Sequence, residues 1–171
     1  MQKKGTLFVT GHRWHKLPFG TDESDLRCKA LVGVVTRTLT EQIEAGISHV
    51  ICGMALGFDT LVAEAFIRLQ AAYPHVTLEA ALICPEQSGK WQPSQRQRLE
   101  RILEFCLSPP TITSPVYVTG CEIARNRYMV DNSRILLACW DGSPSGTGNT
   151  VRYAMEKRVP VIQINPMDLG K

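Results

Sequence analysis

Short apolar runs rich in β-branched residues alternate along the chain with longer segments of helical periodicity. In the longer segments, apolar residues recur every three or four positions, which places them on one face of a helix. The predicted strands are Thr6–Thr10, His49–Cys52, Leu78–Cys84, Val116–Thr119, Ile135–Trp140 and Val159–Ile164. The predicted helices are Asp22–Ala45, a segment through Leu61 and Leu69, Gln95–Cys106, Glu122–Asn132 and Asn149–Lys157.

This alternation predicts an α/β protein with a Rossmann-like, doubly wound architecture. We expect a mainly parallel sheet of about six strands with helices on both faces, because parallel strands need crossover connections. Right-handed crossovers place the loops that follow the strands along one edge of the sheet. No internal repeat or long linker divides the sequence, so residues 1–171 are expected to form one domain.

Composition narrows the functional classes only slightly. The chain has 171 residues, of which 44% are hydrophobic and 20% charged, as in ordinary soluble proteins. A net charge of +3 is too small to indicate nucleic-acid or membrane binding. The six cysteines form no CxxC pair, and Cys52, Cys84 and Cys139 fall inside predicted strands, which favours buried thiols over disulfides. No apolar run reaches membrane-spanning length, and we expect a cytoplasmic location.

The loop Asp141–Thr150 carries the strongest chemical signal. It follows a buried strand and leads into an amphipathic helix. Its glycines leave backbone N–H groups open, its hydroxyls add donors, and a helix N-terminus attracts anions. A plain surface turn with a helix cap accounts for the same residues, but loops in this position bind ligands in α/β folds. The candidate ligand-binding residues here are Asp141, Gly142, Gly146, Thr147, Asn149 and Thr150.

Two further loops follow strands and carry glycine beside charge. Glycine next to a cation in the first loop favours admission of a phosphate, although a solvated turn has the same composition. Asp59, in the second loop, suits a helix cap as well as a ribose or base contact. Neither G-x-G-x-x-G nor G-x-x-x-x-G-K-S/T is present. The candidate residues are Thr10, Gly11, His12, Arg13, Gly53, Ala55, Gly57 and Asp59.

A helical arginine and a tryptophan complete the set of candidates. Arg125, with Asn126 beside it, lies near the start of the helix that precedes the last glycine-rich loop. From this position we expect its guanidinium to bind a phosphate with two parallel hydrogen bonds. Trp91 follows the third strand and suits stacking on a base as well as core packing. No metal site is predicted. Weak catalytic candidates are Arg125, Asp59 and Asp141, but the sequence brings no two carboxylates together.

Several of these residues occur in a characteristic order along nearly the whole chain. They are Thr10-Gly11-His12-Arg13, Gly53-x-Ala55-x-Gly57-x-Asp59, Trp91, Arg125-Asn126-Arg127-x-Met129-Val130-Asp131, and Trp140-Asp141-Gly142 with Gly146-Thr147-x-Asn149-Thr150. This ordered set resembles the SLOG superfamily, which is named for DNA-processing protein A and the "Lonely guy" phosphoribohydrolases. The likeness is greatest to its small single-domain bacterial and phage branch, the YspA/YpsA/YoqJ-like proteins of DUF1273 type.

The resemblance implies a cleft for a nucleotide or a nucleotide-derived ligand. Gly53 and Gly57 would line one wall, and the 146–150 segment would hold phosphate. Arg125 matches the arginine of the phosphoribohydrolases. Their motif resembles P-G-G-x-G-T-x-E-E, and this chain has Asn149 and Thr150 at the two glutamate positions. An amide cannot replace a carboxylate as general base, which argues against that hydrolysis.

Three functional hypotheses remain from the sequence. The first is a domain that senses, carries or sequesters a nucleotide-type small molecule, with a bound nucleotide or phosphate compound as its only expected cofactor. The second is a phosphoribohydrolase-like enzyme acting on nucleoside monophosphates. The third is a DNA-processing or protein-interaction adaptor; the chain lacks the basic strip with interleaved aromatics typical of nucleic-acid binding. The superfamily often pairs through its helices, so a homodimer is also an expectation.

Overall fold

The sheet contains six parallel strands within residues 5–170, the part of the chain that the computed structural model describes. The strand order is β4-β3-β2-β1-β5-β6, and every pairing is parallel. The strand bounds are β1 Thr6–Gly11, β2 His49–Cys52, β3 Thr77–Leu82, β4 Thr111–Ile112, β5 Ile135–Cys139 and β6 Val161–Ile164. This arrangement confirms the predicted α/β class.

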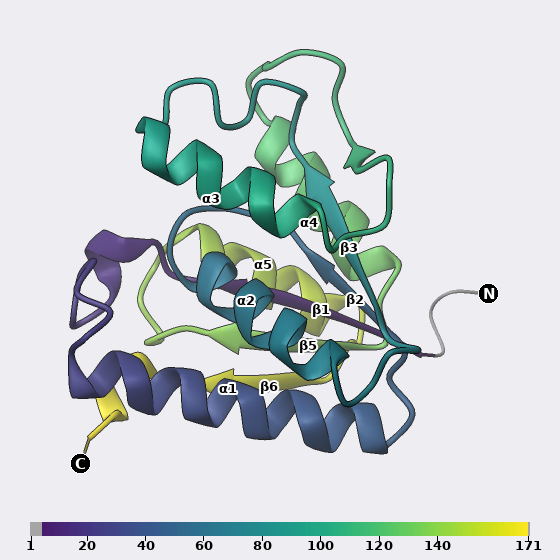
Figure 1. The fold of residues 1–171 in the computed structure, drawn as a ribbon. Helices are drawn as coiled ribbons and strands as arrows, with labels where there is room; N and C mark the ends of the chain where they lie inside the picture. The colour runs from purple at the N-terminus through teal and green to yellow at the C-terminus, as the bar shows by residue number, and fades with distance from the viewer. Residues whose placement is uncertain (1–4, 171) are drawn as a thin grey trace.

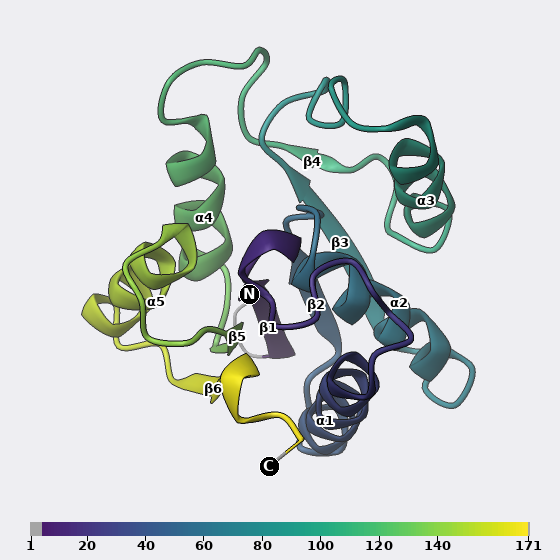
Figure 2. The same ribbon diagram turned by 90° about the vertical axis from the view of Figure 1, so that its left-hand side faces the viewer.

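The helices cover both faces of the sheet (Figures 1 and 2). Helices α1, α2 and α3 pack on one face, and α4 and α5 pack on the other. Among residues 5–170, no helix is both long and apolar enough to cross a membrane. The helix bounds are α1 Leu26–Glu44, α2 Phe58–Gln70, α3 Pro93–Leu103, α4 Cys121–Asp131 and α5 Gly146–Glu156, with short 3-10 helices at Trp14–Lys16 and Pro166–Asp168.

Alternation along the strands builds a core on each side of the sheet. In β1, Leu7 and Val9 join the core under α1, α2 and α3, whereas Phe8 joins the core under α4 and α5. All three side chains are fully buried. Successive strand residues point to opposite faces, so a sheet covered on both sides requires apolar residues at every position. This is why the strands read as continuous apolar runs.

Helix α1 begins later than its hydrophobic pattern predicts. The Asp25 carboxylate accepts a hydrogen bond from the backbone N–H of Arg27 at 2.8 Å and caps the helix, which begins at Leu26, so the predicted start at Asp22 is four residues too early. Asp22 instead binds Ser24 within the preceding turn. Both aspartates are good N-cap residues, and the turn geometry decides between them.

The predicted strand Val116–Thr119 is wrong. The edge strand β4 lies earlier, at Thr111–Ile112, where it pairs with Ala81 and Leu82 of β3. Val116, Tyr117 and Val118 are exposed in the connection to α4. Because β propensity mainly reflects packing on a pleated, half-buried surface, β-branched residues with no neighbouring strand do not form one.

The order of the strands reverses next to β1. From β4, at one edge of the sheet, the chain returns through α4 to β5, which pairs with the other side of β1. The loop after β1 therefore leads toward α1 on one face, and the loop after β5 leads toward α5 on the other (Figure 2). Such a switch point opens a crevice at the carboxyl ends of the strands, where α/β proteins bind ligands.

A buried carboxylate fastens α4 to the sheet. Glu79 of β3 lies 7% exposed beneath this helix. Its oxygens accept hydrogen bonds from Tyr128 Oη of α4 at 2.6 Å and from Thr111 Oγ1 of β4 at 2.8 Å, and His49 Nε2 lies 2.6 Å away. Burial raises the pKa of Glu79, but these hydrogen bonds outweigh it and hold the pKa below its usual value. The ionised form is therefore the one that holds the helix.

Removing the Tyr128 hydroxyl should loosen this attachment. We expect Tyr128→Phe to lower the free energy of unfolding by about 1–2 kcal/mol, because a buried carboxylate loses a donor. Urea unfolding at neutral pH would measure the loss. Tyr153→Phe on the neighbouring helix removes only an exposed hydrogen bond to Asp131 and should change stability by less than about 0.5 kcal/mol. Equal effects of the two variants would contradict the role given to Glu79.

Candidate functional site

A cleft of ≈ 340 Å³ lies at the switch point, between the ends of β1 and β5. Its walls come from the loop after β1, the β2–α2 loop, the first turns of α4 and the start of α5. The predicted site residues that line it are Thr10, Gly11, His12, Arg13, Ala55, Asp59, Arg125, Asn126, Gly146 and Thr147. Residues more than one hundred positions apart in sequence thus share one cavity.

Three of the predicted glycines serve the packing of the walls. A Cβ on Gly11 would lie 2.4 Å from the ring of Phe58. At Gly57, where φ is +103°, it would lie 2.7 Å from the His12 carbonyl. A Cβ on Gly53 would meet the Arg125 guanidinium at 2.6 Å. Each glycine therefore permits a close approach of protein groups, and Gly53 and Gly57 stand behind the cleft surface.

Arg125 brings a buried positive charge into the cleft. Its side chain is 6% exposed, and Nη1 donates to the carbonyl oxygen of Gly53 at 2.7 Å, while Nε donates to Asn126 Oδ1 at 2.9 Å. Burial lowers the pKa of the guanidinium, but an arginine remains charged at physiological pH. No carboxylate of residues 5–170 lies within ion-pair distance of it. A buried cation held only by neutral acceptors is well prepared to receive an anion.

Asp59 places a carboxyl group in the same cleft. It is 6% exposed, and Oδ2 accepts a hydrogen bond from the backbone N–H of Ala55 at 3.1 Å. The other oxygen, Oδ1, is buried and has no hydrogen-bond partner among the described residues. Burial raises the pKa of Asp59 to about 6, although the positive charge of Arg125 opposes the rise. The group therefore changes charge close to neutral pH.

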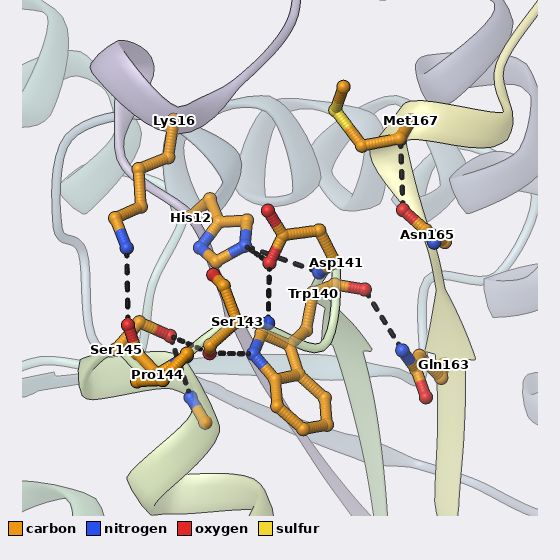
Figure 3. Close-up of polar contacts among 11 residues, drawn as sticks. His12, Lys16, Trp140, Asp141, Ser143, Pro144, Ser145, Gln163, Asn165 and Met167 are labelled. Atoms are coloured by element: carbon orange, nitrogen blue, oxygen red, sulfur yellow. Dashed lines mark hydrogen bonds and ion pairs between the residues drawn. The ribbon is translucent and has the colours of Figure 1, made fainter.

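The segment after β5 is tied back to the loop after β1 (Figure 3). His12 Nε2 lies 2.9 Å from Asp141 Oδ1, and the same oxygen accepts the backbone N–H of Ser143 at 2.9 Å. Hydrogen bonding from Ser143, and then from His12, holds the pKa of Asp141 well below its usual value. Trp140 Nε1 donates to the Ser143 carbonyl at 2.8 Å. Asp141 thus braces the cleft without lining it, as does Gly142, whose φ of +89° turns the chain.

Helix α5 begins inside the predicted anion loop, three residues before its predicted start at Asn149. Ser145 is the N-cap, and its Oγ accepts the N–H of Gly148 at 3.0 Å. Gly146 and Thr147 therefore lie in the first helical turn, and both line the cleft. Their backbone N–H groups have no acceptor among the described residues. Orphan N–H groups of this kind, together with the helix dipole, favour an anion.

The next residues of α5 do not reach the cleft. Thr150 is 3% exposed and donates from Oγ1 to the Gly146 carbonyl at 3.1 Å. Asn149 is exposed and lines a separate groove between α4 and α5. Trp91 also lies outside the cleft, in an adjoining cavity. Thus neither of the two positions aligned with the hydrolase glutamates lines the cleft.

Other lining residues were not among the candidates. His15 and Lys16 belong to the short 3-10 helix after Arg13, which folds them back over the cleft, and Lys16 Nζ donates to the Pro144 carbonyl at 3.4 Å (Figure 3). The basic run after Gly11 was the available signal. Glu122, Met129 and Ser145 complete the lining. Within residues 5–170, no group of three or more His, Cys, Asp or Glu side chains could hold a metal ion.

Comparison with known proteins supports the architecture. UPF0398 protein BH1768 of Halalkalibacterium halodurans is 32% identical over 108 residues, which cover 60% of this chain and 57% of that protein. UPF0398 protein YpsA of Bacillus subtilis is 24% identical over 155 residues, covering 89% and 84%. DNA processing protein A from Streptococcus pneumoniae has the same fold, with a TM-score of 0.60 and 18% identity over 94% of this chain and 50% of its own.

The chain thus spans little more than half the length of the H. halodurans relative and half that of the DNA-processing protein. A family model matches residues 7–169, which cover all the described strands and helices except the first residue of β1, and every residue that lines the cleft. The protein belongs to the YspA SLOG family.

Proposed function

We propose that the cleft binds the phosphate group of a nucleotide or nucleotide-derived small molecule. The observation that carries this proposal is the pairing of two anion donors in one cavity. Among residues 5–170, the buried Arg125 guanidinium has no carboxylate partner, and the N–H groups of Gly146 and Thr147, which have no acceptor there, line the same cleft. Charged and backbone donors of this kind form strong, directional bonds to phosphate oxygens.

A nucleotide is favoured over a simple anion by the place of the cleft. Rossmann-like proteins bind nucleotides at the switch point of the sheet, and the SLOG resemblance implies the same ligand class. The positions aligned with the hydrolase glutamates hold Asn149 and Thr150, neither of which lines the cleft, so we infer a role in sensing, carrying or sequestering the ligand. Kinases and P-loop hydrolases are not models for it, because their glycine-rich motifs are absent.

Asp59 supports a second candidate, hydrolysis of the N-glycosidic bond of a nucleoside monophosphate. A carboxyl group with a pKa of about 6 is partly protonated near neutral pH, as a general acid requires. It would protonate the leaving base as the C1′–N bond breaks and water adds to the sugar carbon, and the proton that the water loses would return to the Asp59 carboxylate, giving free base and ribose 5-phosphate. Chromatography of each nucleoside monophosphate after incubation would detect the base. Release that is lost in Asp59→Asn would support hydrolysis, and no release from any of them would exclude this candidate.

Gly146→Asp should weaken anion binding without unfolding the protein. A Cβ at this position meets no atom within 4 Å, and an aspartate in the first turn of a helix is favourable for folding. The added carboxylate would repel a bound phosphate, and we expect the affinity for pyrophosphate to fall at least about tenfold, or about 1.4 kcal/mol. Calorimetry on the purified full chain would measure it.

Gly146→Asn is the matched control, since it adds nearly the same bulk without charge. If Gly146→Asp bound pyrophosphate as tightly as the asparagine variant, the cleft would not be the anion site. The adaptor hypothesis predicts a different result in cells, where Gly146→Asp would leave the protein's activity intact.

The charge of Asp59 should make anion binding depend on pH. Below its pKa of about 6 this carboxyl is neutral, and above it the negative charge opposes an anion in the cleft. The affinity for sulfate, whose own charge is constant from pH 5 to 8, should therefore fall as the pH rises. A repulsion of about 1 kcal/mol corresponds to roughly a fivefold loss.

His12 and His15 also line the cleft, so the test needs a variant that changes the carboxyl group of Asp59 alone. Asp59→Asn separates the contributions, because it removes only the carboxyl titration and retains an oxygen for the N–H of Ala55. The variant should show a smaller decline over this pH range and a higher affinity at pH 8. Identical pH profiles for the two proteins would show that Asp59 does not face the bound anion.

A further inference from the structure

A second and larger cavity, of ≈ 540 Å³, adjoins the phosphate cleft. It lies between the ends of β3 and α4, and its walls include Ile83, Trp91 and the exposed ring of Tyr117. Pockets for small organic ligands typically have volumes of about 300–1,000 Å³ and apolar or aromatic walls. The proposed phosphate function does not account for this cavity.

The two cavities adjoin one another and share four lining residues. Arg13, Ala55, Glu122 and Arg125 line both of them. Where they meet, Arg13 Nη2 lies 3.9 Å from Glu122 Oε1, and both side chains are about half exposed. Such a long, solvent-exposed ion pair contributes little stability and is readily displaced. A ligand held by Arg125 at one end can therefore extend into the second cavity.

A half-buried amide, that of Gln87, fixes the floor between the cavities. Gln87 Nε2 donates to the carbonyl oxygens of Gly53 and Met54 at 3.0 and 3.1 Å, and its Oε1 accepts the N–H of Ile83 at 2.8 Å. Met54 is held in a left-handed conformation with φ of +56°, which a non-glycine residue rarely adopts. The side chain of Gln87 thus ties the end of β3 to the end of β2 and fixes the floor of the cavity.

Among residues 5–170, two aromatic residues of the cavity have ring groups that lack a hydrogen-bonding or stacking partner. Trp91 is partly buried against the core, and its indole Nε1 donates to no group of the described residues. Tyr117 is 67% exposed and contacts no other aromatic ring within residues 5–170. Exposing an aromatic side chain at the mouth of a cavity keeps a flat surface available for stacking, and every nucleobase has a face that stacks on it.

We propose that this second cavity is the base subsite of the protein, with Trp91 and Tyr117 as its stacking surfaces. The inference rests on the proposed function, because it places the base of the same ligand whose phosphate lies at Arg125. It narrows the ligand class to a nucleotide that carries an aromatic base, in preference to a sugar phosphate or an inorganic anion. Glu86 and Lys90 at the rim supply an acceptor and a donor for the edge of the base.

Calorimetry of the full chain with two probes would test this assignment. Pyrophosphate reports on the phosphate cleft alone, whereas adenosine diphosphate fills both subsites. We expect the diphosphate nucleotide to bind at least about tenfold more tightly than pyrophosphate. Trp91→Ala and Tyr117→Ala should each weaken nucleotide binding by about fivefold or more and leave pyrophosphate binding within twofold. Trp91→Phe, which retains a stacking ring, should restore most of the nucleotide affinity.

The outcomes separate the two proposals. Equal binding of both probes to the unmodified protein, or unchanged nucleotide binding in both alanine variants, would overturn the base subsite while leaving the phosphate site intact. Failure of both probes to bind would overturn the proposed function itself. Tyr73→Ala, which removes a tyrosine outside both cavities, should bind both probes normally. If Trp91→Ala unfolds, Tyr117→Ala decides the question, because the exposed ring of Tyr117 is not part of the core.

Discussion

The cleft depends on one contact, the buried guanidinium of Arg125 against the carbonyl oxygen of Gly53. This hydrogen bond joins α4 to the end of β2, so it fixes the helix at the carboxyl edge of the sheet, where the cleft lies. It also places a charge at the boundary of two cavities. The contact needs the absence of a side chain at Gly53, since a Cβ there would lie 2.6 Å from Nη1. Glycine and arginine therefore act as a pair, although 72 positions separate them.

The structure around this contact is arranged to keep its charge available. Glu79 holds the same helix through its hydrogen bond with Tyr128, on the face of the sheet opposite to α1. Glu79 does not accept a hydrogen bond from Arg125. Beside the same contact, Gln87 Nε2 donates hydrogen bonds to the carbonyl oxygens of Gly53 and Met54. Asp59 lies close enough to oppose the positive charge but does not form an ion pair with it. Because a buried ion pair would neutralise the arginine, the separation of these two groups leaves the guanidinium without an ion-pair partner among residues 5–170, as the proposed anion site requires.

The sequence predicted the class of fold and most of the lining residues of the cleft, because both follow from local signals. Apolar residues that recur with a period of 3.6 indicate the crossover helices, and continuous apolar runs indicate strands covered on both faces. The loops that follow parallel strands meet at one edge of the sheet. The failures have a common physical cause. Val116–Thr119 has strand propensity but no neighbouring strand, and the start of α5 was set by the Ser145 cap rather than by apolar periodicity. Each outcome depended on a partner that the local pattern does not specify.

By itself, the sequence determined that polar and glycine-rich loops would gather at the carboxyl edge of a parallel sheet. It could not assign roles within that edge. Only the tertiary structure decided that Gly11, Gly53 and Gly57 accommodate protein side chains and backbone, that Asp141 braces a loop, and that Asn149 lies outside the cleft. The same holds for the cavity beside Trp91, which joins segments from β2, β3 and α4. The physical reason is that burial, charge compensation and cavity shape are set by contacts between distant segments, whereas helix and strand formation is encoded largely in neighbouring residues.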